Sequence, residues 1–180
     1  MSLSIGDTAP DFTLQNANAN VGASEVSLND VKTENGFVII FECNHCPFVV
    51  ASFSRLNDLA ERAKKDGFGF VGINSNDPEV YADDSFENMV KRANGGMPYA
   101  YLHDSTQEVA TAYGAKRTPE AYLFNGQGEL VYSGRIDDSP RDPTKVTEHS
   151  LADAIDAMLA GQTPAIQQTE SIGCSVKWKQ

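Results

Sequence analysis

The sequence is poor in cysteine, in positive charge and in long apolar runs, and each shortage argues against a class of protein. Three cysteines in 180 residues are too few for the disulfide scaffold of a small secreted domain. The 14 Lys and Arg residues against 25 Asp and Glu residues give a formal net charge of −11. That charge argues against nucleic acid or anionic lipid as a partner, because phosphates would be repelled. No stretch approaches the roughly 18 consecutive apolar residues that span a bilayer.

The N-terminus also lacks the pattern of a secretory signal, since its first residues hold no basic segment followed by an apolar one. We therefore expect a cytoplasmic protein without a membrane segment, although a chain that had lost its leader would look the same. The length suits one domain with a substantial core. We predict a domain over residues 1–161 and a polar C-terminal tail over residues 162–180. The sequence does not indicate an oligomeric state.

Apolar periodicity predicts an α/β fold, a central mixed β-sheet flanked by helices. Continuous apolar runs predict buried strands at residues 37–41 and 68–73, and a repeat at helical spacing predicts a helix over residues 46–65. A polar insertion, residues 77–97, is predicted to hold a helix around residues 86–93. The other expected elements are a short strand near residues 26–28 within a polar loop (15–36), a short helix that Ser105 and Glu108 cap and Gly114 ends, strands at 121–124 and 130–132 joined by a hairpin at 125–128, and a helix over 151–159 stopped by Gly161.

Cys43 and Cys46 carry the chemical signal of the sequence, because they stand three residues apart where a buried strand meets a helix. Side chains at this spacing are neighbours on a helical turn, so the two sulfurs are predicted to switch between dithiol and disulfide. A helix N-terminus favours negative charge, and His45 between the cysteines could add positive charge, so we expect a stabilised Cys43 thiolate. Glu42 would act against it, in a direction that the sequence does not give.

Metal binding is the alternative interpretation of the pair. A structural zinc site needs about four ligands. Only Cys174 and three histidines remain, and none of them forms a second close pair. We therefore predict no metal site and no cofactor.

Three separated motifs make residues 4–160 resemble the thioredoxin superfamily. The segment 37–47, a strand followed by CxxC and a helix, resembles its active site. The segment 5–14 resembles the lead-in shared by peroxiredoxins (AhpC/TSA-related proteins) and TlpA-like thiol–disulfide oxidoreductases. Thr118-Pro119 stands directly before a predicted strand, in the family's cis-proline place. The resemblance implies a thioredoxin-like fold with an N-terminal extension and an inserted helix.

The resemblance also implies site roles. A cis Pro119 with Thr118 would face the cysteines and grip the substrate, while Asn44 and His45 would tune the reduction potential. Asp77 is a candidate proton shuttle for Cys46, or alternatively a residue that caps a turn.

Cys174 ends a Gly-Cys segment like those of CxxC peroxiredoxin-like proteins. Two interpretations stay open for it, a third redox thiol and a free thiol on a flexible tail.

These patterns predict an enzyme, a thiol–disulfide oxidoreductase in which the Cys43 thiolate attacks a protein or small-molecule disulfide and Cys46 resolves the mixed disulfide. A peroxiredoxin-like thiol peroxidase with an antioxidant role, acting on peroxide, is the first alternative. Peroxiredoxins, however, carry Thr or Ser in place of Cys43 and proline in place of Ile39, and Arg117 is out of register with their supporting arginine. A metal-binding module and a non-catalytic interaction domain remain as further alternatives.

Overall fold

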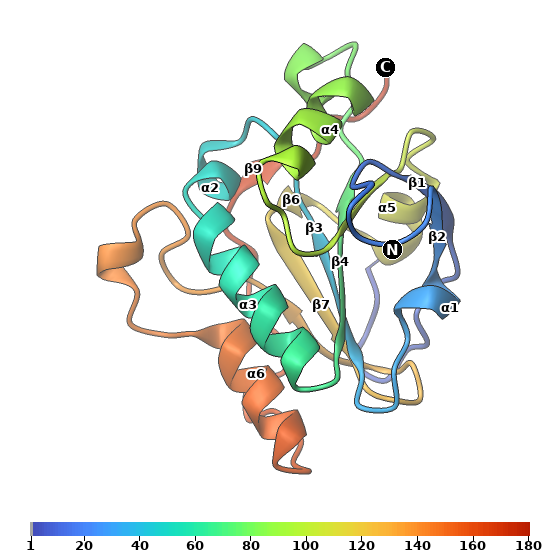
Figure 1. The fold of residues 1–180 in the computed structure, drawn as a ribbon. Coiled ribbons are helices and arrows are strands. Elements are labelled where there is room, and N and C mark those ends of the chain that lie inside the picture. Colours follow the sequence, from blue (N-terminus) through green and yellow to red (C-terminus); the bar gives the residue numbers. More distant parts are fainter. Residues whose placement is uncertain (1) are drawn as a thin grey trace.

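A seven-stranded mixed sheet runs through the middle of the computed structural model, which describes residues 2–180 (Figure 1). Its strand order is β2–β1–β5–β4–β3–β7–β8, in which β3, β4 and β5 are parallel and the outer strands are antiparallel to their neighbours. The predicted mixed α/β sheet is confirmed. The strands are β1 (Thr13–Asn16), β2 (Glu25–Ser27), β3 (Phe37–Phe41), β4 (Gly69–Asn74), β5 (Ala100–His103), β7 (Glu120–Phe124) and β8 (Leu130–Gly134).

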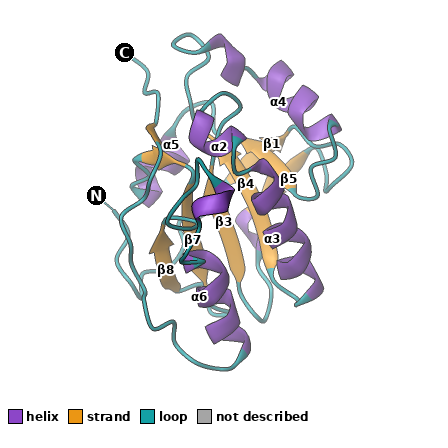
Figure 2. Cartoon of the chain, turned by 90° about the vertical axis from the view of Figure 1, so that its left-hand side faces the viewer, coloured by secondary structure: helices purple, strands orange, loops and turns teal. Residues whose placement is uncertain are grey.

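Strand β3 is buried on both faces, as its unbroken apolar run predicts. Its odd-numbered residues pack into one core with α1 and α5, and its even-numbered residues pack into a second core with α3 and α6. Figure 2 shows α3 and α6 side by side on one face of the sheet. The cysteine loop therefore leaves the most enclosed strand of the fold. These helices are α1 (Leu28–Val31), α3 (Phe53–Lys65), α5 (Glu108–Tyr113) and α6 (Ser150–Leu159).

The helix predicted over residues 46–65 is divided in two, so that part of the prediction is wrong. A short helix, α2 (Pro47–Val50), ends before α3 begins, and Ser52 lies at the break. The Ser52 hydroxyl donates to the carbonyl of Phe48 at 2.7 Å and to that of Pro140 at 3.0 Å. A serine that bonds back to a carbonyl four residues earlier bends a helix, and here a distant loop holds it in that position.

The capping predicted for the helix before Gly114 is also wrong. α5 starts after Gln107, whose φ of 65° is left-handed, and no side-chain cap comes from Ser105. The carboxylate of Asp104 instead accepts hydrogen bonds from two N–H groups in the first turn of the helix, those of Val109 and Ala110, at 3.3 and 2.9 Å. A buried carboxylate at a helix N-terminus does the same work as the expected capping box.

The insertion forms a 3-10 turn, η1 (Ala82–Asp84), followed by α4 (Phe86–Asn94), which confirms the predicted helix. Met89 and Ala93 on α4 pack against Tyr99 and Tyr101 near β5. Figure 1 shows α4 beyond the carboxyl end of β3, near α2. The insertion therefore borders the cysteine loop.

The tail after α6 returns along the body of the protein. The N–H of Thr169 donates to Ser133 on β8, and farther on β9 (Cys174–Ser175) pairs with β6 (Arg117–Thr118) in a separate two-stranded sheet. The sequence predicted neither strand, because two-residue strands leave no periodicity. Within residues 2–180, no helix has both the length and the apolar character that crossing a membrane requires.

Candidate functional site

Cys43 and Cys46 lie in the loop between β3 and α2, at the carboxyl end of the buried strand. Cys46 is the N-cap of α2, and Pro47 follows as its first residue, where proline has no hydrogen bond to lose. Both cysteine side chains are fully buried. The predicted strand-to-helix junction is confirmed, although the helix that follows directly has only four residues.

Cys46 forms a disulfide with Cys174 on β9, and Cys43 is a free, buried cysteine. The Cα atoms of the bonded pair are 6.3 Å apart, within the usual range for a disulfide. The sequence spacing predicted that Cys43 would pair with Cys46, whereas the structure joins Cys46 to a residue 128 positions away. The reason is the β6–β9 pairing, which brings the tail to the cysteine loop. The free-thiol interpretation of Cys174 is therefore wrong for this state of the protein.

Thr118 lies against both sulfurs of the cysteine loop. Its hydroxyl oxygen is 3.4 Å from Sγ of Cys43, and its carbonyl oxygen is 3.5 Å from Sγ of Cys46. The peptide bond between Thr118 and Pro119 is cis, as the resemblance predicts. The structure thus places this segment at the cysteines, while its role in gripping a substrate stays a prediction.

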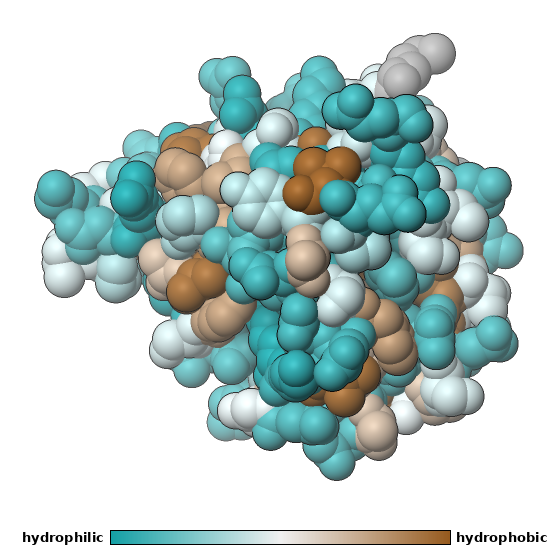
Figure 3. All heavy atoms as spheres, turned by 90° about the horizontal axis from the view of Figure 1, so that it is seen from above, coloured by the Kyte–Doolittle hydropathy of each residue, from teal (hydrophilic) through white to brown (hydrophobic). Residues whose placement is uncertain are grey.

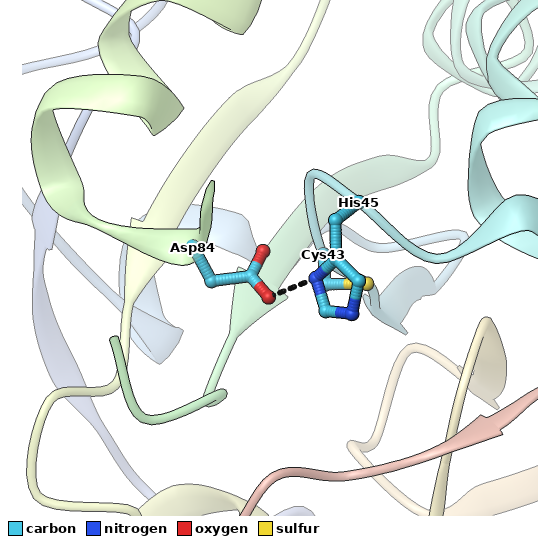
Figure 4. Close-up of side chains that lie close together, drawn as sticks. All are labelled: Cys43, His45 and Asp84. Carbon is cyan, nitrogen blue, oxygen red and sulfur yellow. Dashed lines mark hydrogen bonds and ion pairs between the residues drawn. The ribbon is translucent and has the colours of Figure 1, made fainter. Parts of the chain in front are cut away.

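His45 is hydrogen-bonded to a buried carboxylate that sequence reasoning missed. Its Nδ1 contacts Asp84 of η1, and Figure 4 shows the two side chains facing each other beside Cys43. The Asp84 carboxylate also accepts the N–H of Asn44 at 2.7 Å and the side-chain amides of Asn74 and Asn76 at 3.2 and 3.0 Å. Several donors therefore satisfy the oxygens of this buried carboxylate.

The structure gives Asp77 a different place from Asp84. The Asp77 carboxylate accepts the N–H of Glu79 at 3.1 Å, as a turn residue does, and its own N–H donates to Lys177 at 2.8 Å. Its proton-shuttle role stays a prediction. In the sequence, Asp84 stands just before Ser85, the N-cap of α4, where acidic residues are common, so no signal marks it as a site residue.

Burial raises the pKa of Cys43 from its ordinary value of 9.0 to about 11, and the negative charge of Asp84 adds to the rise. The Thr118 hydroxyl and the N–H groups of Cys46 and His45 act in the opposite direction but are outweighed. The expectation of a stabilised Cys43 thiolate is therefore wrong in this state. Cys43 precedes the cap of a four-residue helix by three positions, so it gains little from that helix terminus.

Glu42 directs its carboxylate away from the cysteines. It forms an ion pair with Arg92 of α4 and accepts the hydroxyl of Tyr99 at 2.8 Å. The Arg92 guanidinium lies over the ring of Phe53, 3.8 Å from its centroid, and also donates to the carbonyl of Cys43 at 3.2 Å. Arg92 thus neutralises the carboxylate that the sequence placed beside Cys43, and it fixes the backbone of that cysteine.

Cys43, His45 and Asp84 bring three potential metal-ligand atoms within 4.8 Å of one another. A thiolate, an imidazole and a carboxylate are ligands that zinc accepts. In the described geometry Nδ1 of His45 already bonds to Asp84, and the pKa of Cys43 keeps its thiol protonated at neutral pH. Ligands bind metal in their deprotonated form, so a metal would have to displace this pair and the thiol proton. The arrangement fits a hydrogen-bonded polar pair better than a metal centre.

The surface above this end of the molecule carries both apolar and polar side chains. Figure 3 shows separate apolar spots among polar side chains. Val50 of α2, Tyr81 before η1 and Trp178 of the tail are large apolar side chains with more than 40% of their surface exposed. The Tyr81 ring stacks on His45 with centroids 3.8 Å apart. Apolar contact area is therefore available around a site whose sulfurs are covered.

Comparison with known structures identifies the fold. A crystal structure of a conserved protein from Geobacillus kaustophilus is 46% identical, covers 98% of this chain and 93% of its own, and superposes with a TM-score of 0.91. The thioredoxin domain of a thiol-disulfide oxidoreductase from Bacteroides vulgatus is 20% identical over 80% of this chain and 97% of its own, with a TM-score of 0.59. The predicted thioredoxin-like fold is confirmed.

Comparison at the sequence level gives the family. The thiol-disulfide oxidoreductase ResA of Oceanobacillus iheyensis is 25% identical over 126 residues, which are 70% of this chain and 62% of that protein. The match thus spans less than two thirds of that relative. The family model for AhpC/TSA matches residues 5–133, which is more than half of the chain. The chain therefore belongs to the AhpC/TSA family.

Proposed function

We propose that this protein is a thiol–disulfide oxidoreductase that exchanges disulfides with a partner through Cys43 and Cys46. The observation that carries the proposal is that three cysteine sulfurs pack together beside one strand edge. Cys43, Cys46 and Cys174 pack in one apolar cluster, and the strand that carries Cys174 is paired with Thr118. The similarity to ResA supports the same chemistry, since that protein is named a thiol-disulfide oxidoreductase.

The exchange needs a thiolate, and the site contains groups that can stabilise one. The Thr118 hydroxyl and the N–H groups of His45 and Cys46 all lower the pKa of Cys43. When the side chains that bury Cys43 move away, the burial that outweighs these three groups is reduced, and the thiolate becomes accessible. In the dithiol form, Cys43 then attacks a partner disulfide and forms a mixed disulfide. Cys46 attacks Cys43, the partner leaves as a dithiol, and Cys43 and Cys46 end as a disulfide.

The side chains around the pair have supporting roles in this proposal. Asn44 is held by its N–H bond to Asp84 and by the hydroxyl of Tyr101, which donates to its side-chain oxygen at 2.7 Å. His45 is fixed through Nδ1, so its ring keeps one orientation beside Cys43 (Figure 4). Asp84 thus acts as a positioning residue for the loop.

Serine variants test the assignment. Insulin reduction with dithiothreitol as the electron source should be lost in Cys43→Ser, and Cys46→Ser should accumulate mixed disulfides with partners. Full insulin reduction by Cys43→Ser would reject Cys43 as the attacking residue. Cys174→Ser is the matched control, because it leaves both members of the pair intact.

A thiol peroxidase is the second candidate, and the Cys46–Cys174 bond favours it. Here peroxide would oxidise the Cys46 thiolate to a sulfenic acid, and Cys174 would condense with it, releasing water and leaving the observed disulfide. Against this, Arg117 donates to the carbonyl of Gly173 at 3.2 Å, which is a contact with the tail and not with a reacting sulfur. Stopped-flow mixing with hydrogen peroxide distinguishes the candidates: a peroxidase oxidises far faster than free cysteine.

A further inference from the structure

The tail strand β9 covers a strand edge that belongs to the cysteine site. β6 lies outside the seven-stranded sheet, and β9 is its pairing partner, with Thr118 opposite Cys174 and Arg117 opposite Ser175. The N–H of Val176 continues the pairing by donating to the carbonyl of Lys116 at 3.0 Å. These contacts are between backbone groups, so any extended segment of suitable shape could make them.

The shape that this edge accepts is restricted at one position. A Cβ atom on Gly173 would lie 2.0 Å from the carbonyl oxygen of Thr118 and 3.1 Å from the nitrogen of Pro119. No side chain fits there unless the backbone of one strand moves away. A segment that places its cysteine on Cys46 in this pairing therefore needs glycine directly before that cysteine.

Hydrogen bonds of the backbone also hold the tail after β9 in place. The N–H of Lys177 donates to the side chain of Asn76 at 2.8 Å, and its carbonyl accepts the side chain of Gln107 at 2.9 Å and the N–H of Asp77 at 2.8 Å. Val176 between these contacts is buried. The disulfide is thus one of several attachments, and it is the one that chemistry can break.

Resting on the proposed function, we propose that β9 is an internal ligand, fastened by the Cys46–Cys174 disulfide, that closes the Arg117–Thr118 edge to partners. A partner takes this edge with an extended polypeptide segment that contains a Gly-Cys pair, as Gly173 and Cys174 do. While the disulfide is intact, the partner has no free edge and Cys43 stays covered.

The site opens by an internal exchange that involves no net oxidation. Cys43 gives up its proton to solvent, and its thiolate attacks Sγ of Cys46. The Cys43–Cys46 bond forms, the Cys46–Cys174 bond breaks, and Cys174 leaves as a thiolate that takes up a proton. The tail strand is then bound only by its hydrogen bonds, and a partner dithiol can displace it. The thiolate of the partner's Gly-Cys pair attacks Sγ of Cys46, and Cys43 leaves as a thiolate. The partner's second thiol then attacks the partner sulfur bonded to Cys46, which releases the partner as a disulfide and returns Cys43 and Cys46 to the dithiol form.

The first test measures the Cys46–Cys174 disulfide in the full-length protein, equilibrated with reduced and oxidised glutathione and quantified by alkylation and mass spectrometry. Gly173→Ala should shift the equilibrium toward reduction by about tenfold or more, the change that losing about 1.4 kcal/mol of strand pairing gives. Ser175→Ala, an exposed position on the same strand, is the control and should shift it by less than about twofold. An unchanged equilibrium in Gly173→Ala would overturn the proposal.

The second test keeps Gly173 unchanged, so it stays valid if Gly173→Ala folds poorly. The full-length double variant Cys43→Ser/Cys174→Ser keeps Cys46 as its single cysteine, so it can capture but not resolve. It is mixed with glutathionylated peptides that carry the sequence of residues 171–176, with glycine or with alanine before the cysteine. Cys46 should capture the glycine peptide about tenfold more favourably. Equal capture refutes the proposal, and because no turnover is required, this result is independent of whether wild-type protein reduces insulin.

Discussion

The reactivity of Cys43 in the oxidised protein should depend on pH in a way that its surroundings determine. Its pKa is raised from 9.0 to about 11, by burial first and by Asp84 second. At pH 7 the thiolate fraction is then about 0.01%, against about 1% for an unshifted thiol, a hundredfold difference that follows from the rise in pKa from 9.0 to about 11. A thiol is neutral below its pKa, so the raised pKa keeps Cys43 neutral over the physiological range. The thiolate, which is the nucleophile, appears only as pH approaches 11.

The measurement is the rate of iodoacetamide labelling of Cys43 from pH 6 to pH 11, with the Cys46–Cys174 disulfide intact and free cysteine as the reference. The rate at neutral pH should be at least about a hundredfold below the reference, because limited access slows it further. Asp84→Asn should move the inflection to lower pH without restoring 9.0, since burial remains. Asp83→Asn, its exposed neighbour, should leave it unchanged. A labelling profile that inflects near or below pH 9 in the oxidised wild-type protein would refute the reasoning.

Two further predictions concern the stability of the scaffold around the site. Glu42→Gln should lower the free energy of unfolding by about 3–5 kcal/mol in urea denaturation, because it leaves the buried Arg92 guanidinium without its counter-ion, and a loss below about 1 kcal/mol would show that the pair is not structurally important. Leu56→Ala, in the core beneath α3, should cost about 2–5 kcal/mol, whereas Leu159→Ala at an exposed position of α6 should change stability by less than about 0.5 kcal/mol, and equal effects would contradict the described burial.

The parts of the fold that were predictable from the sequence are those with long, regular periodicity. The apolar run of β3 and the stripe of α3 reflect burial along one element, so they can be read without knowledge of the rest of the chain. The break at Ser52 could not, because the carbonyl of Pro140 that holds it comes from a distant loop. The short strands β6 and β9 were missed for the same reason: a two-residue strand is defined by its partner and not by its own sequence.

The same distinction between local patterns and distant contacts applies to the candidate site. The CxxC motif could be found because it is local and has a fixed spacing, and the cis bond before Pro119 followed from the resemblance to the thioredoxin superfamily. Asp84 and Arg92 could not, because each acts through a contact with a residue some 40 to 50 positions earlier, at His45 and Glu42. Electrostatic surroundings depend on tertiary contacts. For that reason the sequence predicted the wrong partner for Cys46 and the wrong direction for the pKa of Cys43.

The Cys46–Cys174 bond also closes a covalent ring between residues 128 positions apart, which includes α3, α6 and most of the central sheet. Restricting so long a loop in the unfolded chain is worth about 5 kcal/mol in the chain-entropy treatment. That is a large share of the 5–15 kcal/mol by which domains are typically stable. Forming or breaking this disulfide therefore changes the free energy of unfolding of the entire domain. The melting temperature should thus report whether the protein is in oxidising or reducing surroundings.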